Sequence, residues 1–125
     1  MGSKLQRQEL AEQHYWKVLQ YEQQHPVALI YVAEIAMQKN KWASVMGHLG
    51  QAWDALQANK DISNRDELLR IAGLGRLIAA KHQQTDEATE VVAHTKEWFV
   101  SFELEVPQDI LSAFTEAVSQ RLFDV

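Results

Sequence analysis

The sequence predicts an all-α fold in which about six helices form antiparallel pairs within one domain, residues 1–125. Apolar residues recur every three or four positions along most of the chain, which is the spacing of one helix face. Ala, Leu, Gln and Glu are abundant, whereas only two prolines and five glycines interrupt the pattern. The connections between periodic segments are short, and short connections make consecutive helices antiparallel neighbours.

The first two helices meet at a proline. The first covers about residues 4–24 and ends at His25, because the residue before a proline is driven out of the α region. Pro26 suits the first turn of the next helix, which covers about residues 26–38. This second helix is apolar around much of its circumference, so we expect it to lie between neighbours.

The third helix is predicted over about residues 41–58, after a tight turn in which Asn40 suits a left-handed backbone. Gly47 and Gly50 lie inside this helix. Each glycine lowers helix stability by about 1 kcal/mol relative to alanine. We therefore expect another helix to approach closely at these two positions.

The fourth helix is predicted to be the buried middle of the fold. Ser63 or Asn64 is expected to cap its start, and the helix runs to about His82. Its sequence is strongly apolar, which favours burial on several sides. Gly73 and Gly75 lie within it without a preceding strand, so they indicate close helix packing rather than a phosphate-binding loop.

The last two helices complete the predicted array. Thr85 is expected to cap the fifth helix, which runs to about Glu103. Pro107 is expected to open the sixth helix, which ends near Phe123. The predicted units are a half repeat over about 1–25, helix pairs over 26–58 and 65–104, and a capping helix over 107–123.

Composition excludes several classes of function. The net charge is −5 and no cluster of Lys or Arg occurs, so a nucleic-acid partner is not expected. There is no cysteine, which excludes disulfides and thiolate metal sites. No apolar stretch approaches the roughly 18 residues of a membrane span, and no signal peptide is recognisable, which predicts a cytoplasmic protein. The first three residues, Met-Gly-Ser, are typical of a cloning scar.

An internal repeat is the strongest pattern in the sequence. The same helix positions recur after 34 residues and again after 43, in the triplets Ala11, Tyr15 and Val18; Val45, Leu49 and Ala52; and Ala88, Val92 and Thr95. Periods of this length indicate stacked helix pairs that share a continuous core.

Residues 29–56 resemble a tetratricopeptide repeat (TPR). The positions that carry the resemblance are Leu29, Val32, Ala33 and Ala36 in the first helix, Lys41-Trp42 at the turn, and Val45, Leu49 and Ala52 in the second helix. The Gly–Tyr pair usual in the first helix and the proline that usually ends a repeat are absent. The resemblance implies a short TPR-like α-α superhelix whose first helices line a concave groove.

The resemblance also implies a partner-binding site in that groove. The residues assigned to it are Val27, Ile30, Tyr31, Glu34, Met37, Gln38, Leu69, Ala72, Gly73 and Arg76. This surface is mostly apolar and Arg76 is its one basic residue. An apolar or amphipathic segment of a protein or peptide is therefore the expected ligand, rather than an acidic peptide.

Trp16 is a separate candidate for partner binding. Its neighbour Tyr15 takes the position on the apolar stripe, so the Trp16 side chain is expected to point partly away from the core. An exposed tryptophan fits a contact surface. Packing on a further helix upstream would give the same pattern, and the sequence leaves both interpretations open.

No constellation in the sequence predicts catalysis, a metal site or a cofactor. The five histidines form no HExxH or paired Glu-x-x-His motif, and no paired carboxylates or nucleophile triad are recognisable. The leading hypothesis is a protein–protein interaction module, as an adaptor, chaperone or regulatory domain. The alternative is a self-assembling structural protein, a homodimer through the same apolar faces. A small helical enzyme or metal protein has the least support.

Overall fold

The computed structural model describes residues 4–122, and the side chains of residues 9–120. Within these residues the fold is all-α, as predicted, and contains no strand. Its six helices are α1 (Lys4–Tyr21), α2 (Pro26–Gln38), α3 (Trp42–Ala58), α4 (Arg65–Gln83), α5 (Asp86–Ser101) and α6 (Ile110–Leu122). The suggested cloning scar and the predicted end near Phe123 lie outside the described residues.

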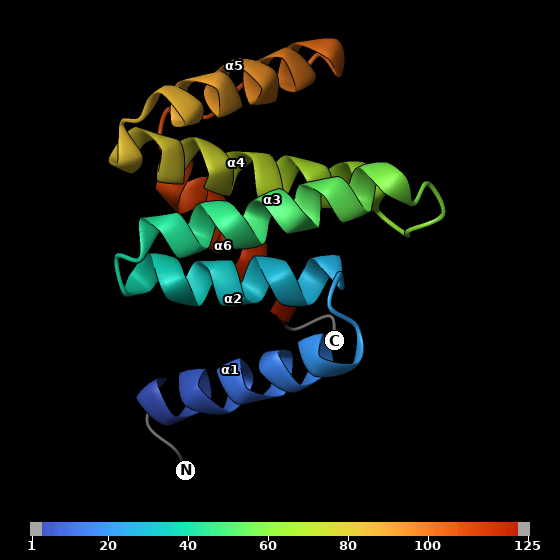
Figure 1. The fold of residues 1–125 in the computed structure, drawn as a ribbon, viewed down its shortest axis with the longest axis vertical. Helices are drawn as coiled ribbons and strands as arrows, with labels where there is room; N and C mark the ends of the chain where they lie inside the picture. Colours follow the sequence, from blue (N-terminus) through green and yellow to red (C-terminus); the bar gives the residue numbers. More distant parts are fainter. Residues whose placement is uncertain (1–3, 123–125) are drawn as a thin grey trace.

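Helices α1 to α5 follow one another across the molecule in chain order, and α6 lies behind them (Figure 1). Helix α4 is the centre of the packing, because it contacts α2, α3, α5 and α6. Eleven of its residues are buried, which confirms that it is the buried middle of the fold. Each of these helices buries apolar surface that it could not bury alone.

Helix α6 differs from the prediction in both its start and its position. It begins at Ile110 rather than Pro107, because the Asp109 carboxylate accepts hydrogen bonds from the Ser112 backbone N–H at 3.1 Å and hydroxyl at 2.7 Å. It does not cap the array by packing on α5: among the described residues, these two helices have no Cα atoms within 8 Å of each other. It packs against α4 and α2 instead.

Local signals at the helix ends were mostly interpreted correctly. Thr85 caps α5, since its hydroxyl oxygen accepts the Ala88 N–H at 3.0 Å. Asn40 is left-handed, with φ 57°. The predicted cap of α4 is wrong, because Asn64 makes no side-chain cap bond. Its φ of 58° is left-handed, whereas a side chain that caps a helix start normally needs an extended backbone.

The glycines fall into two structural classes. A Cβ added at Gly73 would meet α5 side chains, and one at Gly75 would meet α3 and α6 side chains, so close packing explains both. A Cβ added at Gly47 or Gly50 would meet nothing within 4 Å. The expectation that a helix approaches these two residues is therefore wrong, since they face the open space between α3 and α5.

We expect alanine substitutions at two of these glycines to change stability in opposite directions. Gly47→Ala should raise the free energy of unfolding by up to about 1 kcal/mol, because alanine has the higher helix propensity. Gly75→Ala should lower it by about 1–2 kcal/mol, because Leu49 and Phe114 are fully buried and leave no room for a methyl group. Urea denaturation measures both, and a stabilised Gly75→Ala variant would contradict the packing of α6 on α4.

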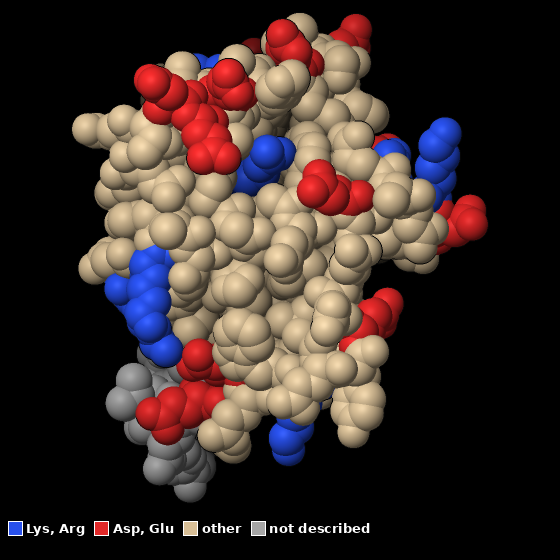
Figure 2. All heavy atoms as spheres, in the orientation of Figure 1, with Lys and Arg blue, Asp and Glu red and all other residues tan. Residues whose placement is uncertain are grey.

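The charged side chains are unevenly distributed over the face shown in Figure 2. Asp and Glu gather over its upper part, where α5 lies, whereas Lys and Arg are scattered. Much of the centre of this face is uncharged. Among the described residues, no helix combines the length and the apolar character that crossing a membrane requires.

Candidate functional site

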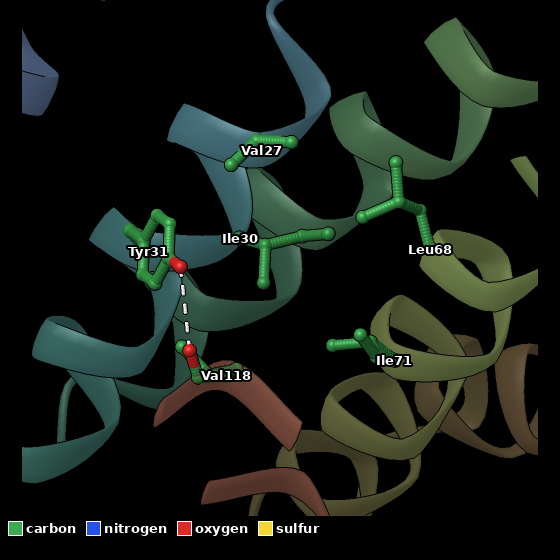
Figure 3. Close-up of a pocket in the computed structure, with 6 residues that line it drawn as sticks. All are labelled: Val27, Ile30, Tyr31, Leu68, Ile71 and Val118. Carbon is green, nitrogen blue, oxygen red and sulfur yellow. Dashed lines mark hydrogen bonds between the residues drawn. The ribbon is translucent and has the colours of Figure 1, made fainter. Parts of the chain in front are cut away.

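Helix α6 covers one half of the predicted groove. Ile30 and Tyr31 lie beneath it, Val27 lines the same small hollow, and the Tyr31 hydroxyl donates a hydrogen bond to the Val118 carbonyl at 3.3 Å (Figure 3). The hollow that remains there measures about 10 Å³, which is no more than one water molecule needs. Ile30 and Tyr31 therefore do not line an open groove, whereas Val27 also lines a separate open cleft of about 550 Å³ beside the connection of residues 59–64.

Tyr31 is held from both sides. Its ring stacks on the Tyr15 ring of α1, with the ring centroids 4.4 Å apart and the planes 22° from parallel. Its hydroxyl reaches α6. One buried side chain of α2 therefore joins the first and last helices of the fold, which fixes the position of the covered half of the face.

The other half of the face is open. A cleft of about 520 Å³, the Glu34 cleft, lies between α2, the start of α3, the end of α4 and α6. Three predicted site residues line it, together with six others: Glu34, Met37 and Gln38, and Asn40, Trp42, His82, Leu111, Ser112 and Thr115. Its volume is within the range of about 300–1,000 Å³ that ligand pockets occupy.

One wall of the Glu34 cleft is a pair of stacked rings. The Trp42 and His82 rings lie 3.9 Å apart between centroids and within 2° of parallel. On the α6 side, Leu111 stands at the edge with 51% of its surface exposed. The cleft thus combines an aromatic wall, an exposed apolar side chain and the carboxyl group of Glu34, which is the combination expected of a site that binds a mixed apolar and polar ligand.

Burial changes the chemistry of Glu34. Loss of hydration raises the pKa of its carboxyl group to about 7, and the hydrogen bond from the Gln38 amide, at 3.4 Å, opposes this rise. The carboxyl group is therefore divided between its charged and neutral forms near neutral pH. A group in a cleft with a pKa shifted this far is a candidate for ligand binding.

The predicted site residues on α4 do not join the cleft. Leu69, Ala72, Gly73 and Arg76 were assigned to the groove, but Gly73 and Arg76 face the α3 and α5 side, and Leu69 and Ala72 are fully buried. The α4 residues that meet α2 or α6 lie one position earlier: Leu68 and Ile71 share a hollow with α2 residues and Val118, and Gly75 faces α3 and α6. An error of one residue turns a side chain by about 100° around a helix, which is enough to reverse the assignment.

Arg76 has a packing role in the observed structure. Its guanidinium lies over the Trp53 ring, 4.8 Å from the ring centroid, which is a cation–π contact. Burial lowers the pKa of Arg76, and the negative charge of Asp54 opposes this effect. Its Nε atom is buried without a hydrogen-bond partner among the described residues.

Trp16 lies apart from the Glu34 cleft. Its ring meets the His48 ring of α3 edge to face, 5.6 Å between centroids, and its indole N–H donates to the Glu12 carboxylate at 3.4 Å. The side chain is 43% exposed, so it does point partly away from the core, as expected. Other exposed apolar side chains lie at Leu10 and Tyr21 on α1 and at Val100, Phe102 and Leu104 around the end of α5.

The sequence interpretation missed the α6 and His82 sides of the cleft. A signal for the buried face of α6 was present, since Phe114 and Val118 are four residues apart and are buried together. That spacing does not indicate that the surface covered by Phe114 and Val118 belongs to α2 and α4.

Among the described residues, no group of three or more His, Asp or Glu side chains could hold a metal ion. Comparison with protein-family models, curated proteins and solved structures finds no significant match to this chain.

Proposed function

We propose that this protein is an interaction module that binds an amphipathic segment of a partner protein in the Glu34 cleft, alongside α6. In this proposal it serves as an adaptor, chaperone or regulatory domain in the cytoplasm. One observation carries the proposal: the α2 and α4 face already holds an amphipathic helix, α6, with Phe114 and Val118 buried against it.

Two further features support the same proposal. The surface continues past α6 into an open cleft, with Leu111 exposed at its edge, where a partner side chain would find apolar surface to bury. The resemblance of residues 29–56 to a TPR agrees with it, because the first helices of that family line a peptide-binding groove.

A photo-crosslinking amino acid at position 111 tests the proposal. The variant Leu111→p-benzoylphenylalanine is irradiated in lysate of the cells that make the protein, and adducts are identified by mass spectrometry. We expect one discrete adduct, with the crosslink in an amphipathic helical segment of the partner. Excess unlabelled protein should abolish the adduct, because it competes for the same partner segment.

The matched control is the same amino acid at Val100, which is 74% exposed on α5, far along the array from α2. Adducts at position 100 with none at position 111 would place the interface elsewhere and would contradict the proposal. Adducts of equal yield at both positions would indicate contact without a specific site.

Self-association is a second candidate, and the exposed apolar residues of α1 favour it. Tyr21 is 93% exposed and Leu10 is 66% exposed. Large apolar side chains on one helix are a common feature of interfaces between copies. An adduct with twice the mass of the chain, together with a mass in solution that rises with concentration, would support a homodimer.

A further inference from the structure

Glu34 is an acid without a counter-charge among the side chains that the structure describes. It is the only Asp or Glu among the residues that line the Glu34 cleft, and the lining contains no Lys or Arg. Among the described residues, its hydrogen-bond partner is the Gln38 amide, and no ion pair involves it. His82 is the one other titratable group in the lining.

A partly buried carboxylate in this state is destabilised. Burial removes hydrating water, and an amide at 3.4 Å replaces little of it. A cation that entered the cleft would restore the lost electrostatic interaction, and the low surrounding polarity would strengthen that attraction. The cleft is therefore electrostatically suited to a positively charged group.

The hydroxyls on the α6 side of the cleft add to this preference. The Ser112 hydroxyl donates its hydrogen to Asp109, and the Thr115 hydroxyl donates to the backbone carbonyls of Leu111 and Ser112. Because their hydrogens are used in these bonds, both oxygens are left able only to accept further hydrogen bonds. The Ser112 and Thr115 oxygens and the Glu34 carboxylate are all acceptors, so they suit a ligand side chain that carries only hydrogen-bond donors.

The apolar lining selects a long side chain over a bare ion. Met37 and Leu111 provide surface for methylene groups, and the Trp42 ring lies close enough to the cleft to line it. A cation near an aromatic ring gains a further attraction. Arginine has both an apolar stem and a planar head with five donors, so it meets all of these conditions.

We infer that the Glu34 cleft receives an arginine side chain of the partner segment, with Glu34 as its counter-charge. This inference rests on the proposed function, since it names the chemistry of the segment that the same cleft would bind. The partner is therefore a helix or peptide that carries an arginine between apolar residues.

Two tripeptides that differ in one charge test the inference. Acetyl-Leu-Arg-Leu-amide and its citrulline analogue, which has the same shape without the charge, are titrated into the protein at pH 8. Binding is followed through the NMR signals of the Trp42 indole and the Leu111 methyl groups. We expect half-saturation at a concentration at least fivefold lower for the arginine peptide.

Two variants assign the preference to the cleft. Glu34→Gln should reduce the difference between the peptides to less than twofold. Thr115→Val, which keeps the shape and removes one acceptor, should weaken the binding of both peptides about twofold and leave the difference between them unchanged, because citrulline keeps N–H donors and lacks only the charge. Circular dichroism checks that both variants remain helical.

The failures of the two proposals are distinguishable. Equal half-saturation for the two peptides, with shifts at Trp42 and Leu111, would overturn the arginine inference and leave the cleft as a peptide site. The absence of shifts with either peptide would also overturn the inference. Crosslinking at position 111 would then decide independently whether the cleft binds partner proteins.

Discussion

Phe114→Ala is expected to lower the free energy of unfolding by about 3–5 kcal/mol, the largest effect of any substitution discussed for this protein. The Phe114 side chain is completely buried, and its ring lies where a side chain on Gly75 would have to be. Truncation would leave a cavity between α6 and α4 that neither helix can close. Urea denaturation followed by tryptophan fluorescence measures the change.

Leu111→Ala is the matched control, because Leu111 is on the same helix but is half exposed. It should cost less than about 1 kcal/mol, since the truncated side chain loses little burial. Limited proteolysis in the connection 102–109 gives a second readout, which should accelerate in Phe114→Ala alone. Equal stability losses for the two variants would mean that α6 does not pack on this face in solution.

Glu34→Gln is expected to stabilise the protein in a manner that depends on pH. Folding raises the pKa of Glu34 from 4.5 to about 7, so the folded protein holds a proton that the unfolded chain releases over this range. Stability should therefore fall as the pH rises from 4.5 to 7, by about 3 kcal/mol in total. Glutamine is neutral throughout, so the variant should lack this loss.

Denaturant unfolding at two pH values checks the sign. At pH 8 the Glu34→Gln variant should be more stable than the parent protein by up to about 3 kcal/mol. At pH 4 Glu34 is mostly protonated in both the folded and the unfolded state. The parent protein and the Glu34→Gln variant should therefore differ little in stability. A variant that is less stable at pH 8 would show that the charged carboxylate has a favourable partner, which contradicts its isolation in the cleft.

Several helix boundaries were predictable because the signals that set them are local, whereas the start of α6 was not. Pro26 starts α2, Asn40 ends the turn after it, and Thr85 caps α5, and each of these effects depends on residues within one helical turn. The predicted and observed second helix agree at both ends. Periodicity and composition also predicted the all-α fold class correctly, because both are properties of short stretches of sequence.

The arrangement of the site was less predictable because it depends on residues far apart in the chain. The contact between Tyr31 and Val118 joins positions 87 residues apart, and neither residue type identifies the other. On α4, Gly73 and Gly75 each allow a close neighbour. The presence of a small residue therefore could not show which side of α4 packs against α6. The assignment of the α4 residues was wrong by one position for that reason.

The late position of α6 in the chain has a consequence for synthesis on the ribosome. Tyr31 is made 87 residues before Val118, the residue that accepts its hydrogen bond. At about 5–20 residues per second, this interval lasts roughly 4–17 s. Throughout that time the apolar face of α2, and that of α4 once it has been made, lacks its cover, so the nascent chain exposes apolar surface until its last helix closes the fold.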